Sequence, residues 1–94
     1  MAMNAKMAGK ISKALADPHR LTILKELKKQ KNCLYCADIG DVIELAQPSI
    51  SHHLKLLTDV EIITSEKEGR NIKYKLNDKV LDEYITFLEE LKKP

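Results

Sequence analysis

The stretch "QPSISHHLKLL", residues 47–57, decides which fold this chain adopts. At about 100° per residue along a helix, Ile50, Leu54 and Leu57 share one face. His53 falls beside that apolar face, and the residues that point elsewhere are Pro48, Ser49, Ser51, His52, Lys55 and Leu56. An ordinary solvent-facing helix in a chain with 32% charged residues would carry more Glu and Lys. The pattern predicts a helix that packs by one apolar edge and exposes a short, hydrogen-bonding surface.

Such a surface suits a helix lying in the major groove of DNA. Short side chains let the backbone approach, hydroxyls and Gln47 reach phosphates or base edges, and Lys55 meets the phosphate charge. A surface helix that is polar for no further reason fits the same residues about equally well. The elements around this helix separate the two interpretations.

Helical spacing of apolar residues predicts two helices upstream. The first covers residues 4–15, with an apolar side made by Met7, Ile11, Ala14 and Leu15. The second has Asp17 as N-cap and Pro18 in its first position, and runs to about residue 30. Its predicted core stripe is Leu21, Leu24 and Leu27, with Ile23 beside it.

A short helix through Ile39, Val42 and Ile43 follows, and only a tight link separates it from the helix that opens at Gln47-Pro48. A link of this length is what a helix-turn-helix requires. Beyond it the period changes from helical to alternating, so residues 62–76 are predicted to form a β-hairpin with Gly69 in its turn.

The last helix, with Asp78 as its predicted cap, carries more apolar residues than one small core can use. They are Val80, Leu81, Tyr84, Ile85, Phe87, Leu88 and Leu91. The surplus predicts a homodimer that packs through the first and last helices.

The fold class expected from these elements is mainly α with a β-hairpin wing: a winged helix-turn-helix in the order α-α-α-α-β-β-α. A chain of 94 residues allows one domain, residues 1–94, with a modest core. The net charge of +2 conceals basic clusters, since residues 1–31 hold eight Lys or Arg against two acids. In a winged helix, a hairpin containing Lys67, Arg70 and Lys73 can lie against neighbouring phosphates.

Over nearly its whole length the chain resembles the ArsR/SmtB family of small dimeric winged-helix repressors. "ALADPHRLTILKEL" is similar to the second-helix signature of the family, "QPSISHHLKLL" to its recognition helix and "EGRNIKYKL" to its wing. The resemblance implies a homodimer that covers double-stranded operator DNA and releases it when an inducer binds, with Gln47, Ser49, Ser51 and His52 facing the DNA. One departure is that Val60 and Glu61 stand where the family commonly has a small residue and Gly, so the chain is expected to bend differently before the wing.

The only two cysteines, Cys33 and Cys36, are spaced CxxC just before or within the first turn of the short helix. If that turn is helical, the two thiols share a face, and the positive end of the helix favours thiolates. No apolar run is long enough for a membrane helix or a secretory signal, so we expect a cytoplasmic protein whose thiols stay mostly reduced.

Three uses of the thiol pair remain open: a sensor of metal, metalloid or oxidant, two small half-buried hydrophobic residues, and cysteine catalysis. The first is favoured because the pair has motif spacing in a chain with no other cysteine. The resemblance adds that several relatives bind arsenite, antimonite or a soft divalent metal at this helix, through a CxC arrangement. Arsenite, cadmium or zinc would need further ligands here. Catalysis is least favoured because no partner His and acid are evident, so no enzyme activity and no required cofactor are expected.

The metal site that relatives commonly have on the last helix is expected to be absent, because that helix has no histidine, and a metal role is not expected for His52 or His53. His19 is expected on the surface, and His53 is expected to be a half-buried packing or hydrogen-bonding residue. The leading hypothesis is a DNA-binding repressor. The alternative is a winged-helix dimer for protein interaction, with structural cysteines and no inducer.

Overall fold

Two capped helices begin the chain. The computed structural model describes residues 3–30, 34–35, 39–40 and 43–93. Helix α1 (Ala5–Leu15) starts where Oδ1 of Asn4 accepts the Met7 N–H at 2.8 Å. Helix α2 (Pro18–Lys29) starts where Oδ1 of Asp17 accepts the N–H of His19 at 2.8 Å and of Arg20 at 3.3 Å. Both helices begin as predicted, because each has an acceptor side chain at its N-cap.

The core faces of these helices differ in part from the prediction. Helix α1 buries Ala8, Ile11 and Ala14, whereas Met7 is 40% exposed. The predicted stripe of α2 was wrong in its first member, since Leu21 is 47% exposed and the buried residues are Ile23 and Leu27. Helical spacing alone does not choose between adjacent faces. The choice is made by packing, because α2 contacts both a later helix and a strand of the hairpin.

The helix over residues 47–57 forms as predicted and packs into the core by its apolar face. Helix α4 (Gln47–Asp59) buries Ile50, Leu54 and Leu57 to 1% exposure or less. Residues 39–40 before it are helical, and the Ile43 N–H bonds to the Ile39 carbonyl at 3.0 Å. Val42 of the predicted short helix lies outside the described residues. The described residues therefore support a helix, a tight link and a second helix.

The predicted hairpin consists of β2 (Ile63–Glu68) and β3 (Asn71–Leu76). They pair antiparallel from Ile63 opposite Leu76 to Glu68 opposite Asn71, and Gly69 turns with φ 61°. A third strand, β1 (Leu34–Tyr35), pairs with β3 and completes a sheet in the order β1-β3-β2. Two residues are too few to show an alternating pattern, so β1 was not predicted.

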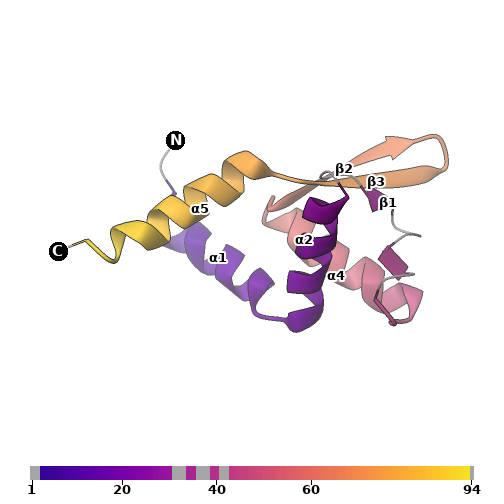
Figure 1. The fold of residues 1–94 in the computed structure, drawn as a ribbon, viewed down its shortest axis with the longest axis horizontal. Coiled ribbons are helices and arrows are strands. Elements are labelled where there is room, and N and C mark those ends of the chain that lie inside the picture. The colour runs from indigo at the N-terminus through magenta and orange to yellow at the C-terminus, as the bar shows by residue number, and fades with distance from the viewer. Residues whose placement is uncertain (1–2, 31–33, 36–38, 41–42, 94) are drawn as a thin grey trace.

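Helix α5 (Asp78–Glu90) packs beside α1 at the end of the molecule opposite the hairpin tip (Figure 1). Asn77, and not the predicted Asp78, is the N-cap, because its Oδ1 accepts the Val80 N–H at 3.3 Å. The Tyr84 hydroxyl lies 2.8 Å from the Ser12 hydroxyl of α1 and hydrogen-bonds to it. Tyr84 is buried, whereas Ile85, Leu88 and Leu91 are 44%, 41% and 71% exposed. The apolar surplus of this helix is therefore uncovered in one chain.

The turn between α4 and β2 places a non-glycine residue in the left-handed conformation. Glu61 has φ 62°, its N–H bonds to the Thr58 carbonyl at 2.9 Å, and the Ile62 N–H bonds to the Leu57 carbonyl at 3.2 Å. These two bonds form a Schellman motif, in which Gly is the usual residue at the position of Glu61. Glu61 thus adopts the conformation that Gly favours, at the cost of conformational strain, and a bend that differs from that of the relatives stays a prediction.

Glu61→Gly is therefore expected to raise the free energy of unfolding by about 0.5–1 kcal/mol. The relief of left-handed strain, about 1–2 kcal/mol, is partly offset by the greater freedom of Gly in the unfolded chain. Urea denaturation measures the change. Glu61→Ala is the matched control, because it removes the same exposed side chain and keeps the strain. Equal stability of the two variants would contradict this explanation.

Candidate nucleic-acid interface

Helix α4 exposes one polar face along its length. Ser49, Ser51, His52 and Lys55 are all exposed, whereas the opposite face is buried in the core. Gln47 is the first residue of the helix. The sequence-predicted residues of α4 thus share a helix whose position is set by the core and whose outer surface is free of packing within one chain.

The N-terminus of α4 has no side-chain cap and no nearby acidic residue on the helix. Ala46 is its N-cap and offers no side-chain hydrogen bond, and the first turn contains no acidic residue. The Ala46 carbonyl accepts the N–H of Ser49 at 3.0 Å and of Ile50 at 3.2 Å. A helix N-terminus without an acidic cap keeps its partial positive charge and favours an approaching phosphate.

The three cations predicted on the hairpin lie at different places: two on opposite faces of the sheet and one in the turn. Residues directly opposite each other in an antiparallel pair lie on the same face of the sheet. Lys67 pairs with Ile72 and shares the face of Ile63, whereas Lys73 pairs with Glu66 on the other face. Arg70 is exposed in the turn between the strands. Arg70 is therefore the cation at the tip, with one lysine on each side of the hairpin.

Two of the predicted cations already have acidic neighbours. Lys55 Nζ lies 3.0 Å from Asp59 Oδ2, and Lys73 Nζ lies 3.8 Å from Glu68 Oε1. The Lys55 pair is exposed on both sides, and exposed pairs of this kind contribute about 0–1 kcal/mol. Lys55 can therefore leave Asp59 and bind a phosphate with little loss of free energy.

Arg20 connects α4 to the first two helices. Its Nη1 lies 3.1 Å from Nδ1 of His53 on α4, and its Nε and Nη2 donate to the carbonyls of Ala14 and Lys13 at the end of α1. A guanidinium only donates, so Nδ1 of His53 must be the acceptor and the ring must be neutral. His53 is half-buried and hydrogen-bonded, as predicted. The role of Arg20 was missed, because its partner is 33 residues away in the sequence.

The same contacts lower the pKa values of His53 and Asp17. Partial burial lowers the pKa of His53, and the guanidinium of Arg20 lowers it further against the opposing effect of Asp17. Partial burial alone would raise the pKa of Asp17, but the N–H bonds from Arg20 and His19 and the Arg20 charge reverse this and lower it. A neutral His53 and an ionised Asp17 are the forms that fit these hydrogen bonds.

The two cysteines lie outside the described residues, but the two residues between them do not. Leu34 and Tyr35 form strand β1, which pairs with Tyr74 and Lys73 of the wing. Leu34 and Tyr35 are extended and not helical, and the prediction that the two thiols share a helical face falls on residues outside the described ones.

Comparison with known proteins gives the family. The helix-turn-helix domain family matches residues 15–66. The arsenical resistance operon repressor of Staphylococcus xylosus is 39% identical over 80 residues, which cover 85% of this chain and 75% of that protein. The chain belongs to the ArsR/SmtB family of helix-turn-helix transcriptional repressors.

Two further relatives bear on the extent of this ArsR/SmtB likeness. A crystal structure of an ArsR family transcriptional regulator superposes with a TM-score of 0.84 at 25% identity and covers 98% of this chain and 93% of that one. The repressor SmtB of Mycobacterium tuberculosis is 35% identical over 71 residues, which cover 76% of this chain and 51% of that protein. The chain thus spans about half the length of the mycobacterial relative. This is a family of repressors and not of enzymes, and no described helix is long and apolar enough to cross a bilayer.

Arg20→Ala is expected to lower the free energy of unfolding by about 1–3 kcal/mol, because it removes charged hydrogen bonds to α1 and α4 and leaves Nδ1 of His53 half-buried without its donor. Chemical denaturation followed by circular dichroism tests this. The control is Lys25→Ala, which removes an exposed cation from the same helix. An equal loss in both variants would show that Arg20 acts only as a surface charge.

Proposed function

We propose that the chain is a repressor that binds double-stranded operator DNA as a homodimer, with α4 in the major groove. The observation that carries this is the two-sided character of α4. Its apolar face is fixed in the core, and its other face presents Ser49, Ser51 and His52. A recognition helix needs this combination, because base edges are read only by side chains held in a fixed register.

The division of labour among the side chains follows from their positions. Gln47, Ser49, Ser51 and His52 lie toward the start of α4, where recognition helices contact base edges. Lys55 is one turn further on, next to the phosphate backbone. Arg70 at the wing tip and one of the two flanking lysines, Lys67 or Lys73, contact phosphates. Because the lysines are on opposite faces, we do not expect both to approach the same strand of DNA.

The second copy covers the exposed apolar residues of α1 and α5. Met7, Ile85, Leu88 and Leu91 are each at least 40% exposed in one chain. They lie on helices at the far end of the molecule from the hairpin, so a dimer formed there leaves both wings free (Figure 1). A two-fold dimer also presents two recognition helices to two half-sites of an operator.

Reversal of the charges at Lys55 and Arg70 together should weaken binding to a DNA fragment from upstream of the coding gene by about 100-fold or more at low salt. The slope of log affinity against log salt should also become shallower, by about 0.9 for each phosphate that the variant no longer neutralises. Electrophoretic mobility shift at several salt concentrations measures both quantities.

The matched control is the reversal of Lys92 and Lys93, two exposed cations after α5 at the opposite end from the hairpin. It makes the same change in net charge and should leave binding nearly unchanged. If both double variants lose the same affinity, net charge and not this interface governs binding, and the proposal fails. If the unaltered chain binds a protein partner but does not bind DNA, the protein-interaction alternative is favoured.

We further propose that Cys33 and Cys36 sense an inducer, which is a thiophilic metal, a metalloid or an oxidant. The relative from Staphylococcus xylosus is an arsenical resistance operon repressor. The residues between the cysteines pair with β3, so a reaction at either thiol occurs one residue from a strand attached to the wing. Two thiolates bind soft cations weakly alone, so arsenite, cadmium or zinc would take a further ligand.

The Cys33→Ser, Cys36→Ser double variant should bind operator DNA as tightly as the parent but should not release it when arsenite, cadmium, zinc or an oxidant is added. Fluorescence anisotropy of labelled DNA, titrated with each inducer, measures the release. Release of the double variant at the same concentrations as the parent would show that the thiols are structural.

A further inference from the structure

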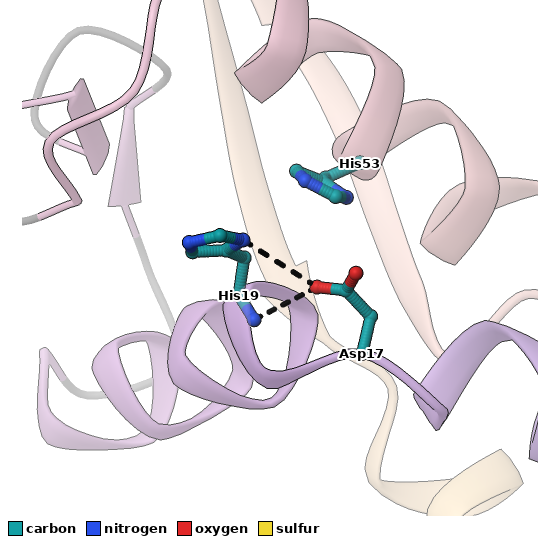
Figure 2. A group of neighbouring side chains, drawn as sticks. All are labelled: Asp17, His19 and His53. Atoms are coloured by element: carbon teal, nitrogen blue, oxygen red, sulfur yellow. Dashed lines mark hydrogen bonds and ion pairs between the residues drawn. The ribbon is translucent and has the colours of Figure 1, made fainter.

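We infer that Asp17, His19 and His53 form a binding site for a divalent transition metal ion, separate from the cysteines and bridging α2 to the recognition helix. One ligand atom from each residue lies within 4.8 Å of those of the other two. Figure 2 shows the three side chains at the corners of a triangle, with Asp17 and His19 at the start of α2 and His53 on α4. Two imidazoles and a carboxylate are a donor set that zinc, cobalt, nickel and copper accept and that calcium and magnesium do not prefer.

The ligand atoms are close enough to be drawn together by an ion. Metal–nitrogen bonds of about 2.0–2.1 Å place tetrahedral ligands about 3.3 Å apart, so separations of at most 4.8 Å must close by at most about 1.5 Å. His19 is half-exposed, at 50%, and can make this adjustment by rotating its side chain. Its ring is already 5.7 Å from that of His53 between centroids.

The carboxylate can act as a ligand without giving up its structural role. Oδ1 of Asp17 accepts the two N–H bonds that cap α2, and it lies 3.7 Å from Nδ1 of His19. The other oxygen points toward His53 (Figure 2). A metal bound through that second oxygen would leave the cap of α2 in place.

Occupation of this site and the bond between Arg20 and His53 exclude each other. If the ion takes Nδ1 of His53, Arg20 loses its acceptor. If the ion takes Nε2, the ring proton moves to Nδ1, which then can no longer accept from a guanidinium. Arg20 keeps its bonds to the Ala14 and Lys13 carbonyls in either case, so its guanidinium still has hydrogen-bond acceptors. His53 is therefore bonded either to Arg20 or to the metal. When the ion binds, a metal bond to Asp17 and His19 replaces the hydrogen bond from Arg20 as the link between α4 and the start of α2.

The test uses the Cys33→Ser, Cys36→Ser protein without DNA, so that neither the thiols nor operator binding affects the result. Zinc and cobalt affinity is measured by competition with a chromophoric chelator, and the ligands of cobalt by visible absorption. We expect one ion per chain. His19→Ala, Asp17→Asn and His53→Gln should each weaken binding by about tenfold or more, as loss of one of three protein ligands implies.

These variants were chosen to keep the fold. Asn is as good an N-cap as Asp, so Asp17→Asn removes the charged ligand and retains the cap. Gln at position 53 can still accept from Arg20, and His19 is exposed. His52→Ala is the control, because His52 is the neighbouring histidine of α4 and lies outside the cluster. The proposal is overturned if no stoichiometric ion binds, or if His52→Ala weakens binding as much as the three cluster variants.

The exchange is tested by Arg20→Met, which removes the competing donor and should tighten metal binding several-fold. Unchanged or weaker binding by a folded Arg20→Met protein would overturn it. The ring nitrogens of His53 and the Nη1 protons of Arg20, which donate to Nδ1 of His53, provide a readout in the Cys33→Ser, Cys36→Ser protein itself. Zinc should shift both sets of NMR signals together, and a shift at His53 with none at Arg20 would show that the bond survives.

Discussion

The structure depends on the burial of one edge of α4. Ile50, Leu54 and Leu57 are each at most 1% exposed, and full burial of such a side chain contributes about 1.5–3 kcal/mol relative to exposure. Three such side chains at helical spacing fix the rotation of α4 about its own axis. A rotation of one residue, about 100°, would expose all three and bury polar side chains. The rotation that the core selects is the one that leaves Ser51, His52 and Lys55 in solvent.

Arg20 adds a second constraint of a different kind. Hydrophobic burial sets which face of α4 is inside but is not directional, whereas a hydrogen bond to Nδ1 of His53 specifies a distance and an angle. The guanidinium serves three acceptors on two helices, so α1, α2 and α4 meet at one planar group. This junction lies one residue from His52, on the exposed face of the recognition helix. A change in the bonding of His53 therefore directly affects its neighbour His52 at the candidate interface.

The parts of the fold that the sequence predicts are those with a local physical cause. Asp17-Pro18 begins a helix through bonds to the next residues, and the hairpin is indicated by alternation and by Gly69. The inward side of α2 and the strand β1 depend on what packs or pairs with them from elsewhere in the chain, so no local pattern predicts either. The same division holds for the site. The face of α4 follows from its spacing, but the cluster of Asp17, His19, Arg20 and His53 is created only when α4 crosses the start of α2.

The strain at Glu61 shows how the wing is tied to this arrangement. Leaving α4 through a Schellman turn commits the next residues to a fixed direction, and Asn77 reinforces it: its side chain donates to the Glu61 carbonyl and its N–H to the Ile62 carbonyl, both at 2.9 Å. Asn77 is also the N-cap of α5. One residue thus joins the end of the recognition helix, the base of the hairpin and the start of the helix with the exposed apolar stripe. A second copy that covers that stripe would fix α5, and through Asn77 it would fix the angle at which the wing leaves α4.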